Sequence, residues 1–246
     1  MAARVTFLGT GDTYNAGSRG HASYFVTTPD ARFLLDCGAT ALQGLKREGF
    51  AALDLDAILL SHLHGDHFAG IVFFFLAFLY ETPRQRPLTL VGPPGTERRV
   101  RDLFQAMYHD LASRPLPFRL DFVEVQPGAR TEIGAIDLLP FRVPHQKSEV
   151  SLGFRVNVDG KTILYSGDTG WTDDLIRQSE GADLLISECC FFENRLPIHL
   201  DYPRLHENRH RFSVRRMILT HLGREVLAHR DEVEIELAGD GLVAAV

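Results

Sequence analysis

The sequence predicts one α/β domain that spans residues 1–246 and is organised around a polar site. Short apolar runs, which are typical of buried strands, alternate with segments of helical periodicity, and no linker or repeat divides the chain. In open α/β sheets, ligands bind beyond the carboxyl ends of the strands. Five of the apolar runs end in a side chain that could bind a metal ion or support a ligand to one: His62, His145, Asp168, Glu188 and His221.

Composition and charge narrow the class of protein. Hydrophobic residues make up 45% and charged residues 24% of the chain, as in a globular domain with a large core. The net charge of −6 provides no diffuse positive field that would attract nucleic acid. The longest apolar run, Phe68 to Tyr80, is shorter than the roughly 20 residues that span a membrane. We therefore expect no membrane partner.

The cysteines indicate a reducing compartment. The chain has three, Cys37 and the adjacent Cys189 and Cys190, with no C-x-x-C pair and no framework for disulfides. The apolar segment from Met1 to Leu8 is too short for a signal peptide. We expect a cytoplasmic protein.

The apolar pattern also predicts individual elements. A hairpin is expected through Gly128, and a second one in the C-terminal tail over residues 232–246. The expected strands cover residues 4–8, 23–27, 31–35, 56–60, 88–91, 118–125 and 136–143. The expected helices cover residues 40–48, the apolar segment from 69, and residues 96–111, 172–181 and 203–216.

The densest group of candidate ligands lies in the segment Ser61-His62-Leu63-His64-Gly65-Asp66-His67. It directly follows the apolar run of residues 56–60, which predicts a buried strand. Three histidines and a carboxylate within six positions can share a metal only if the backbone turns sharply, which Gly65 permits. The alternative is a polar turn with histidines that bind nothing, and the spacing disfavours it.

Distant residues complete the set of candidate ligands. Seven side chains are too many for one tetrahedral ion, but divided between two ions they form a dinuclear site with Asp168 as the bridge. Asp36 and Glu188 are candidates to accept hydrogen bonds from the outer ring nitrogens of the ligating histidines. Nitrogen and oxygen donors without thiolates suit Zn²⁺, Mn²⁺ or Fe. The seven are His62, His64, Asp66, His67, His145, Asp168 and His221.

Five motifs, in this order, resemble the metallo-β-lactamase superfamily and, within it, the ribonuclease Z-like phosphodiesterase branch. The resemblance spans nearly the whole chain. It implies a four-layer αββα sandwich of two sheets with helices outside. The motifs are Leu34-Leu35-Asp36-Cys37-Gly38, His62-x-His64-x-Asp66-His67, His145, Ser166-Gly167-Asp168-Thr169 and Leu219-Thr220-His221.

The resemblance also implies how the ligands divide. One ion is expected on His62, His64 and His145, and a second on Asp66, His67 and His221. Zn²⁺ is the usual metal of the family, and relatives are often homodimers. Two such ions can hold a hydroxide between them for attack on phosphorus.

Two further features bear on which activity the resemblance implies. The bridging aspartate in Ser166-Gly167-Asp168-Thr169 is absent from true β-lactamases and present in phosphodiesterases, tRNA 3′-processing nucleases and glyoxalase II-like thioesterases. His199 matches an additional histidine that this branch uses as proton donor, although its Ile198-His199-Leu200 context differs from the usual one. We expect Asp66 to orient the nucleophile and His199 to protonate the leaving alkoxide. A surface-loop histidine is the alternative for His199.

The interval before Asp168 bears on the substrate. Only residues 146–167 separate His145 from Asp168, which leaves no room for the basic arm with which ribonuclease Z-type enzymes grip tRNA. The sequence therefore favours small or cyclic phosphodiesters over structured RNA. The remaining alternatives are a tRNA 3′-processing endonuclease, a glyoxalase II-like thioesterase or lactonase, and a non-catalytic metal-binding module.

Overall fold

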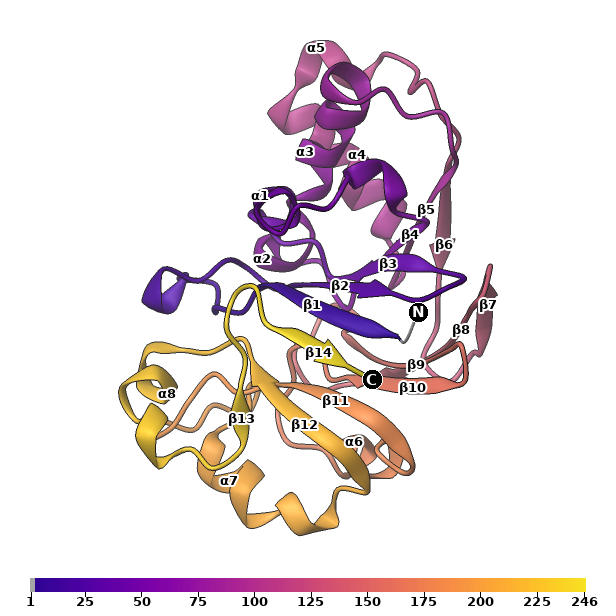
Figure 1. Ribbon diagram of the computed structural model, residues 1–246. Coiled ribbons are helices and arrows are strands. Elements are labelled where there is room, and N and C mark those ends of the chain that lie inside the picture. The colour runs from indigo at the N-terminus through magenta and orange to yellow at the C-terminus, as the bar shows by residue number, and fades with distance from the viewer. Residues whose placement is uncertain (1–2) are drawn as a thin grey trace.

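Two seven-stranded sheets pack face to face, with helices on both outer faces, in the computed structural model (Figure 1). The structure describes residues 3–246, so Met1 and Ala2 of the N-terminal segment lie outside the described residues. The predicted αββα architecture is confirmed. In Figure 1 the first sheet and its helices form the upper half of the molecule, and the second sheet and its helices form the lower half.

The first sheet has the strand order β14-β1-β2-β3-β4-β5-β6. β1 to β3 are antiparallel neighbours, and β3 to β6 run parallel. Its strands are β1 (Arg4–Gly9), β2 (Ser23–Thr27), β3 (Arg32–Leu35), β4 (Ala57–Leu59), β5 (Leu88–Gly92), β6 (Leu120–Glu124) and β14 (Val243–Ala245).

The second sheet has the order β13-β12-β11-β10-β9-β8-β7. β10 to β13 run parallel, and β7 to β10 are antiparallel neighbours. Its strands are β7 (Thr131–Ile133), β8 (Ile136–Arg142), β9 (Leu152–Val158), β10 (Lys161–Tyr165), β11 (Ala182–Glu188), β12 (Val214–Thr220) and β13 (Glu236–Leu237).

Helices of the two halves cover opposite outer faces (Figure 1). Among residues 3–246, no helix is both long and apolar enough to cross a membrane. Over the first sheet lie α1 (Ala41–Arg47), α2 (Gly65–Phe68), α3 (Ile71–Leu76), a π-helical turn (Ala77–Glu81), α4 (Thr96–Met107) and α5 (His109–Ala112). Over the second sheet lie α6 (Asp173–Gln178), α7 (Tyr202–Glu207) and α8 (Arg224–Ala228).

The strands bury both faces, which explains their nearly continuous apolar sequences. In β11, Leu184 and Ile186 point into the core between the sheets, whereas Leu185 packs outward among the residues beneath α6 to α8. Because alternate side chains of the strand pack into two separate cores, one strand contacts both the opposite sheet and the outer helices. The carboxyl ends of the parallel strands are thereby held in register.

Two predicted hairpins are wrong, because each pair of strands belongs to different sheets. β6 lies in the first sheet and β7 in the second, so the turn at Gly128 carries the chain from one sheet to the other. The hairpin is instead formed by β7 and β8, through Gly134. In the tail, β13 pairs with β12 and β14 with β1, and the segment at Asp240 crosses between the sheets. The apolar pattern locates strands but does not choose their partners.

Two helices are shorter in the structure than the sequence predicts. The helix expected over 96–111 is interrupted at Tyr108, whose φ of −139° and ψ of 63° separate α4 from α5. The helix expected over 203–216 ends at Glu207 and is followed by a 3₁₀ turn and by β12. In β12, Arg216 forms an ion pair with Glu236 of the neighbouring strand. An arginine-rich sequence is compatible with the surface of a helix or of a strand. In this segment, pairing with the neighbouring strands favours the strand.

A buried arginine stabilises the connection between β4 and β5. Arg84 is 1% exposed, and burial lowers the pKa of its guanidinium to about 10. Its nitrogens donate hydrogen bonds to four backbone carbonyls, and its guanidinium lies 5.1 Å from the Phe78 ring centroid. The carbonyls belong to Leu53, Leu55, Arg86 and Pro87.

Replacing Arg84 with methionine should therefore lower the free energy of unfolding by about 3 kcal/mol, because the volume is kept but buried carbonyls lose their donors. Urea denaturation measures this. The matched control is Arg86→Met, which removes an exposed ion pair with Asp56 and should cost less than about 1 kcal/mol. Equal midpoints for the two variants would show that the buried hydrogen bonds contribute nothing.

Candidate metal centre and active site

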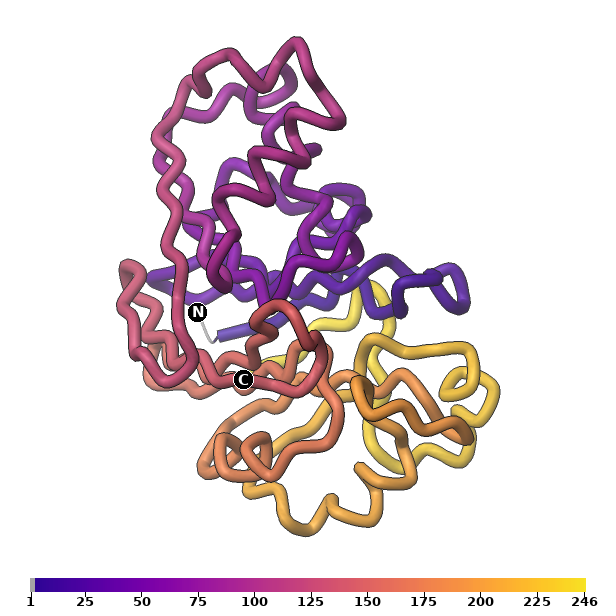
Figure 2. The backbone as a smooth tube through the Cα atoms, turned by 180° about the vertical axis from the view of Figure 1, so that it is seen from behind, coloured from indigo at the N-terminus to yellow at the C-terminus, as the bar shows by residue number. Residues whose placement is uncertain are grey.

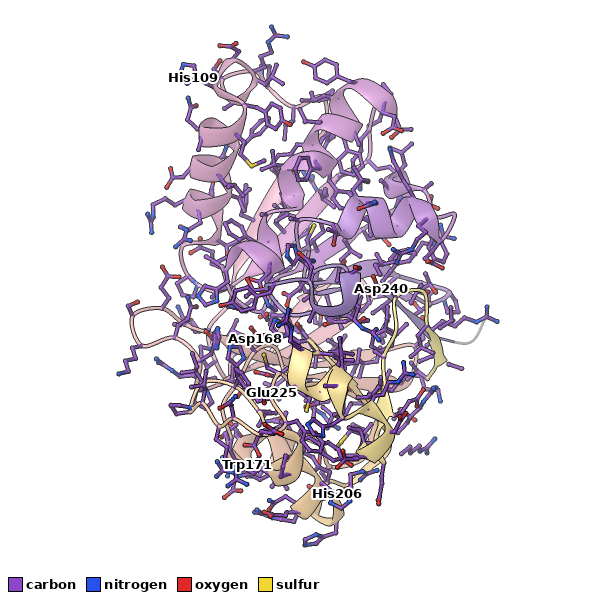
Figure 3. All side chains as sticks on the ribbon, turned by 90° about the vertical axis from the view of Figure 1, so that its left-hand side faces the viewer. His109, Asp168, Trp171, His206, Glu225 and Asp240 are labelled. Carbon is purple, nitrogen blue, oxygen red and sulfur yellow. The ribbon has the colours of Figure 1, made fainter. Side chains whose placement is uncertain are left out.

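The predicted ligands converge where the carboxyl ends of strands from both sheets meet. Asp168, which follows β10, lies at the junction between the two halves of the molecule (Figure 3). The side chains surround a cavity of about 500 Å³. It is lined by Asp12, Thr13, Tyr14, His64, Gly65, Asp66, His145, Asp168, Cys190, Phe191, Leu196, Ile198, His199 and His221.

Three imidazoles form the first group of ligand atoms. His64 Nδ1 lies 3.1 Å from His62 Nε2 and 3.1 Å from His145 Nε2. Nitrogens bound about 2.0–2.1 Å from one tetrahedral ion are separated by roughly this distance. Burial lowers the pKa of His62 well below its ordinary value and also lowers those of His64 and His145, so the neutral, metal-binding form is favoured. His145 Nδ1 lies 3.0 Å from the Ile198 carbonyl, which directs Nε2 into the site.

The second group pairs two imidazoles with two carboxylates. Asp66 Oδ2 lies 3.5 Å from His67 Nε2 and 3.4 Å from His221 Nε2. These separations exceed those of direct charge-assisted hydrogen bonds and suit atoms arranged around a shared cation. Burial alone would lower the pKa of His221, but the carboxylates of Asp168 and Asp66 outweigh it and raise that pKa to about 9. The same carboxylates would favour a divalent cation at this position.

Asp168 lies between the two groups. Its Oδ2 is 3.3 Å from His67 Nε2 and 3.4 Å from His221 Nε2 on one side. On the other side it is 3.9 Å from His62 Nε2 and from His145 Nε2. Its Oδ1 is buried and has no hydrogen-bond partner among residues 3–246. A carboxylate in this position can bridge two metal ions, so the donor set fits the dinuclear centre expected from the sequence.

Asp36 holds the start of the segment Ser61 to His67 in place and orients His67, a member of the second group. Its fully buried carboxylate accepts hydrogen bonds from the Ser61 backbone NH at 2.6 Å, the Ser61 hydroxyl at 2.7 Å and the Tyr165 hydroxyl at 2.5 Å. It also lies 2.7 Å from His67 Nδ1, which directs His67 Nε2 towards the ligands. Ser61 and Tyr165 were missed as supporting residues. A tyrosine at the end of a buried strand needs a partner for its hydroxyl, which is the one signal the sequence offered.

The backbone at the site adopts conformations that most residues avoid. Asp36 and His221 have φ angles of 56° and 52°, in the left-handed region. Gly167, directly before Asp168, has a φ of 57°, and an added Cβ would lie 2.5 Å from the Leu152 carbonyl oxygen. Sharp turns at the strand ends thus direct the side chains into the site. Such sparsely populated backbone conformations commonly cluster at functional sites.

Glu188 supports His199 rather than one of the seven candidate ligands. Its Oε1 lies 2.9 Å from His199 Nδ1 and accepts a hydrogen bond from the Thr169 backbone NH at 2.6 Å. Burial alone would lower the pKa of His199, but the adjacent carboxylate raises it above its ordinary value. The His199 ring faces the site, with its centroid 4.9 Å from that of His145. A histidine beside the ligands whose protonated form is favoured by a carboxylate is suited to proton donation.

Replacing Glu188 with glutamine tests this pairing. Because the neutral amide no longer favours the protonated imidazole, the pKa of His199 should fall, and the alkaline limb of the rate profile should move to lower pH. The measurement is kcat against pH for the variant and the wild-type protein. An unchanged alkaline limb would show that Glu188 does not govern the proton on His199.

Carboxylates anchor the two loops that flank the cavity. Asp240 accepts hydrogen bonds from the backbone NH groups of Thr10 and Gly20, at the two ends of the first loop. Glu225, at the start of α8, accepts three from the backbone of residues 192–194 in the second loop. Partial burial opposes ionisation of Glu225, yet these bonds lower its pKa to about 2. In Figure 3, Asp240 lies above Asp168 and Glu225 lies below it.

The family follows from a comparison with known proteins. The family model described as "Anti-Pycsar protein Apyc1" matches residues 3–239, almost the whole chain. The chain belongs to the Apyc1 family. Its site residues therefore lie within the matched region.

Individual relatives of this Apyc1-family chain agree with the ribonuclease Z-like branch. Ribonuclease Z of Mycobacterium bovis (strain BCG / Pasteur 1173P2) is 31% identical over 191 residues, which cover 74% of this chain and 68% of the relative. The structure of human tRNase Z, short form, superimposes with a TM-score of 0.78 and 25% identity over 99% of both chains. The metallo-β-lactamase fold protein YhfI of Bacillus subtilis gives 0.78 with 23% identity, over 99% of this chain and 100% of that one.

These relationships confirm the predicted superfamily and branch. Together with the clustered histidines and aspartates, they support a metal-dependent hydrolase.

Proposed function

We propose that this chain is a phosphodiesterase that hydrolyses small or cyclic phosphodiesters with the aid of two divalent ions, Zn²⁺ being the first candidate. The position of Asp168 carries the proposal, because one carboxylate oxygen lies 3.3 to 3.9 Å from four imidazole nitrogens. Bound at these residues, two divalent ions would supply a nucleophilic hydroxide and neutralise charge on the phosphoryl oxygens.

Side chains of the protein would hold the two ions, orient the nucleophile and protonate the leaving group. His62, His64 and His145 would hold one ion, and the second would lie on Asp66, His67 and His221, with Asp168 shared. Asp66 would also orient the nucleophile as a hydrogen-bond acceptor. His199, hydrogen-bonded to Glu188 through Nδ1, would donate its Nε2 proton to the leaving alkoxide.

The cavity favours a small substrate. No lysine or arginine is among the described residues that line it. A polynucleotide backbone would need several cationic contacts, whereas a single phosphodiester needs only the centre itself. The interval before Asp168 consists largely of β9 and β10, which are paired within the second sheet. It therefore offers no arm for tRNA.

The names of the relatives keep tRNA processing as the second candidate. A substrate panel distinguishes the two, together with the thioesterase alternative. Purified protein is assayed on bis(p-nitrophenyl) phosphate, 3′,5′-cyclic nucleotides, S-lactoylglutathione and a precursor tRNA, each with and without a chelator. We expect chelator-sensitive turnover of the small diesters. Faster turnover of the thioester, or cleavage of the precursor tRNA alone, would overturn the proposal.

A further inference from the structure

His64 is the one exposed side chain among the seven candidate ligands. The other six are buried, so that packing fixes their positions. The Nδ1 atom of His64 lies 3.1 Å from the Nε2 atoms of both His62 and His145, so Nδ1 is the atom turned towards the first ion. An imidazole that packing leaves free depends on a hydrogen bond at its outer nitrogen to keep this orientation. The partner of His64 Nε2 is therefore of particular interest.

Gln146, the residue directly after His145, contacts this outer nitrogen. Its amide nitrogen lies 3.0 Å from His64 Nε2, and the Ser151 hydroxyl donates a hydrogen bond to its Oε1 at 3.1 Å. Ser151 is buried, and its carbonyl accepts a hydrogen bond from the Val143 backbone NH at 3.0 Å. The amide of Gln146 is thus held on one side by a fixed residue and meets His64 on the other.

An ion pair holds the segment of residues 146–151 against the first half of the molecule. Glu149 Oε1 lies 2.8 Å from Nη1 of Arg99, which belongs to α4. Arg99 Nη2 also donates a hydrogen bond to the Leu63 carbonyl at 3.2 Å. In Figure 2 the loop that follows β8 meets the purple segments of that half. Arg99 therefore joins the segment that carries Gln146 to the segment that carries His64.

Binding of an ion at Nδ1 decides which nitrogen of His64 carries the proton. A neutral imidazole has one donor and one acceptor, so Nε2 must donate when Nδ1 binds a metal. The amide of Gln146 keeps its shape after a half-turn about its terminal bond, which exchanges its oxygen and its nitrogen. With Oε1 facing His64, the amide NH₂ donates to the Ser151 hydroxyl, which can accept as well as donate. Both contacts are kept in the tautomer that binds metal.

We infer that Gln146 is a positioning residue for the first metal ion: its amide oxygen accepts the Nε2 proton of His64, and Ser151 holds the amide in place. The inference rests on the proposed function, since it concerns an ion that the reaction would use. Partners of this kind fix the tautomer and the orientation of a ligating ring, and their loss weakens metal binding by about tenfold to a hundredfold. Gln146 itself would touch neither the ion nor the substrate.

Zinc binding to variants of the whole chain tests this role without turnover. Chelator-stripped wild-type, Gln146→Leu and Gln146→Glu proteins are equilibrated with a series of zinc buffers, and the zinc bound per chain is measured. Leucine has a similar volume but no acceptor, so one binding step should weaken by about tenfold to a hundredfold while the other is unchanged. Glutamate keeps an acceptor for the Nε2 proton, so Gln146→Glu should bind zinc at least as tightly as the wild-type protein.

Gln105→Leu is the matched control. Gln105 lies on α4, contacts His109 and is not among the residues that line the metal-centre cavity, so its zinc binding should match the wild type. Wild-type affinity in Gln146→Leu, weakening of both steps, or equal losses in Gln146→Leu and Gln146→Glu would overturn the inference. Diester turnover at saturating zinc is scored separately. A Gln146-dependent affinity without turnover in the wild type would remove the proposed function alone, and turnover with an unchanged affinity would remove the positioning role alone.

Discussion

Replacing Asp168 with alanine should reduce diester hydrolysis by at least about a thousandfold, because the loss of metal-based charge stabilisation removes several kcal/mol from the transition state. Its Oδ2 lies within 3.9 Å of two histidine nitrogens in each of the two groups. The variant should also bind less metal than the wild-type protein. Elemental analysis and turnover of bis(p-nitrophenyl) phosphate measure the two effects on the same preparation.

Asp183→Ala provides the matched control. Asp183 lies in the same sheet, at the opposite end of β11 from Glu188, and pairs with Lys161 and Arg215. Its removal should leave metal content and turnover unchanged. If Asp168→Ala kept both the full metal content and wild-type turnover, the bridging role would be wrong.

Replacing His199 with alanine should lower kcat by roughly a hundredfold to ten-thousandfold while the metal content stays unchanged. The effect should depend on the leaving group. A cyclic nucleotide expels a basic alkoxide and needs the proton, whereas p-nitrophenolate is stable enough to leave with less assistance. The loss of rate should therefore be much larger for the cyclic nucleotide than for bis(p-nitrophenyl) phosphate.

His206→Ala is the control for this prediction. His206 lies on α7, is exposed, and contacts Glu234 rather than the site. Its removal should change neither substrate's kcat. Equal losses on both substrates in His199→Ala would argue against proton donation, and a loss of metal would assign His199 to the ligands instead.

The sequence predicted the candidate site better than the path of the chain. A ligand such as His62 or His221 lies one residue beyond an apolar run, so the end of that strand fixes its position whichever strands pair with it. The structure accordingly brings the seven candidate ligands together. The partner of a strand depends instead on long-range packing, which is why the turns at Gly128 and Asp240 were mistaken for hairpins.

Supporting residues were harder to predict than ligands. Asp36 belongs to a recognisable strand-end motif, and its contact with His67 matches the expectation. Ser61 and Tyr165 contribute through hydrogen bonds to that same carboxylate, across separations of 25 and 129 residues. Glu188 stands out as a strand-end carboxylate, but only the folded loop shows that its partner is His199. Local sequence carries no record of such long-range contacts.

If two metal ions at these residues make the chain a phosphodiesterase, as we propose, activity must follow the number of ions bound. Chelator-stripped protein is titrated with Zn²⁺, and bound metal and turnover of bis(p-nitrophenyl) phosphate are followed together. We expect no turnover without metal, and full recovery only when two ions are bound per chain. Full turnover of the stripped protein, or two bound ions with no turnover of any diester, would show that the chain is not a two-metal phosphodiesterase.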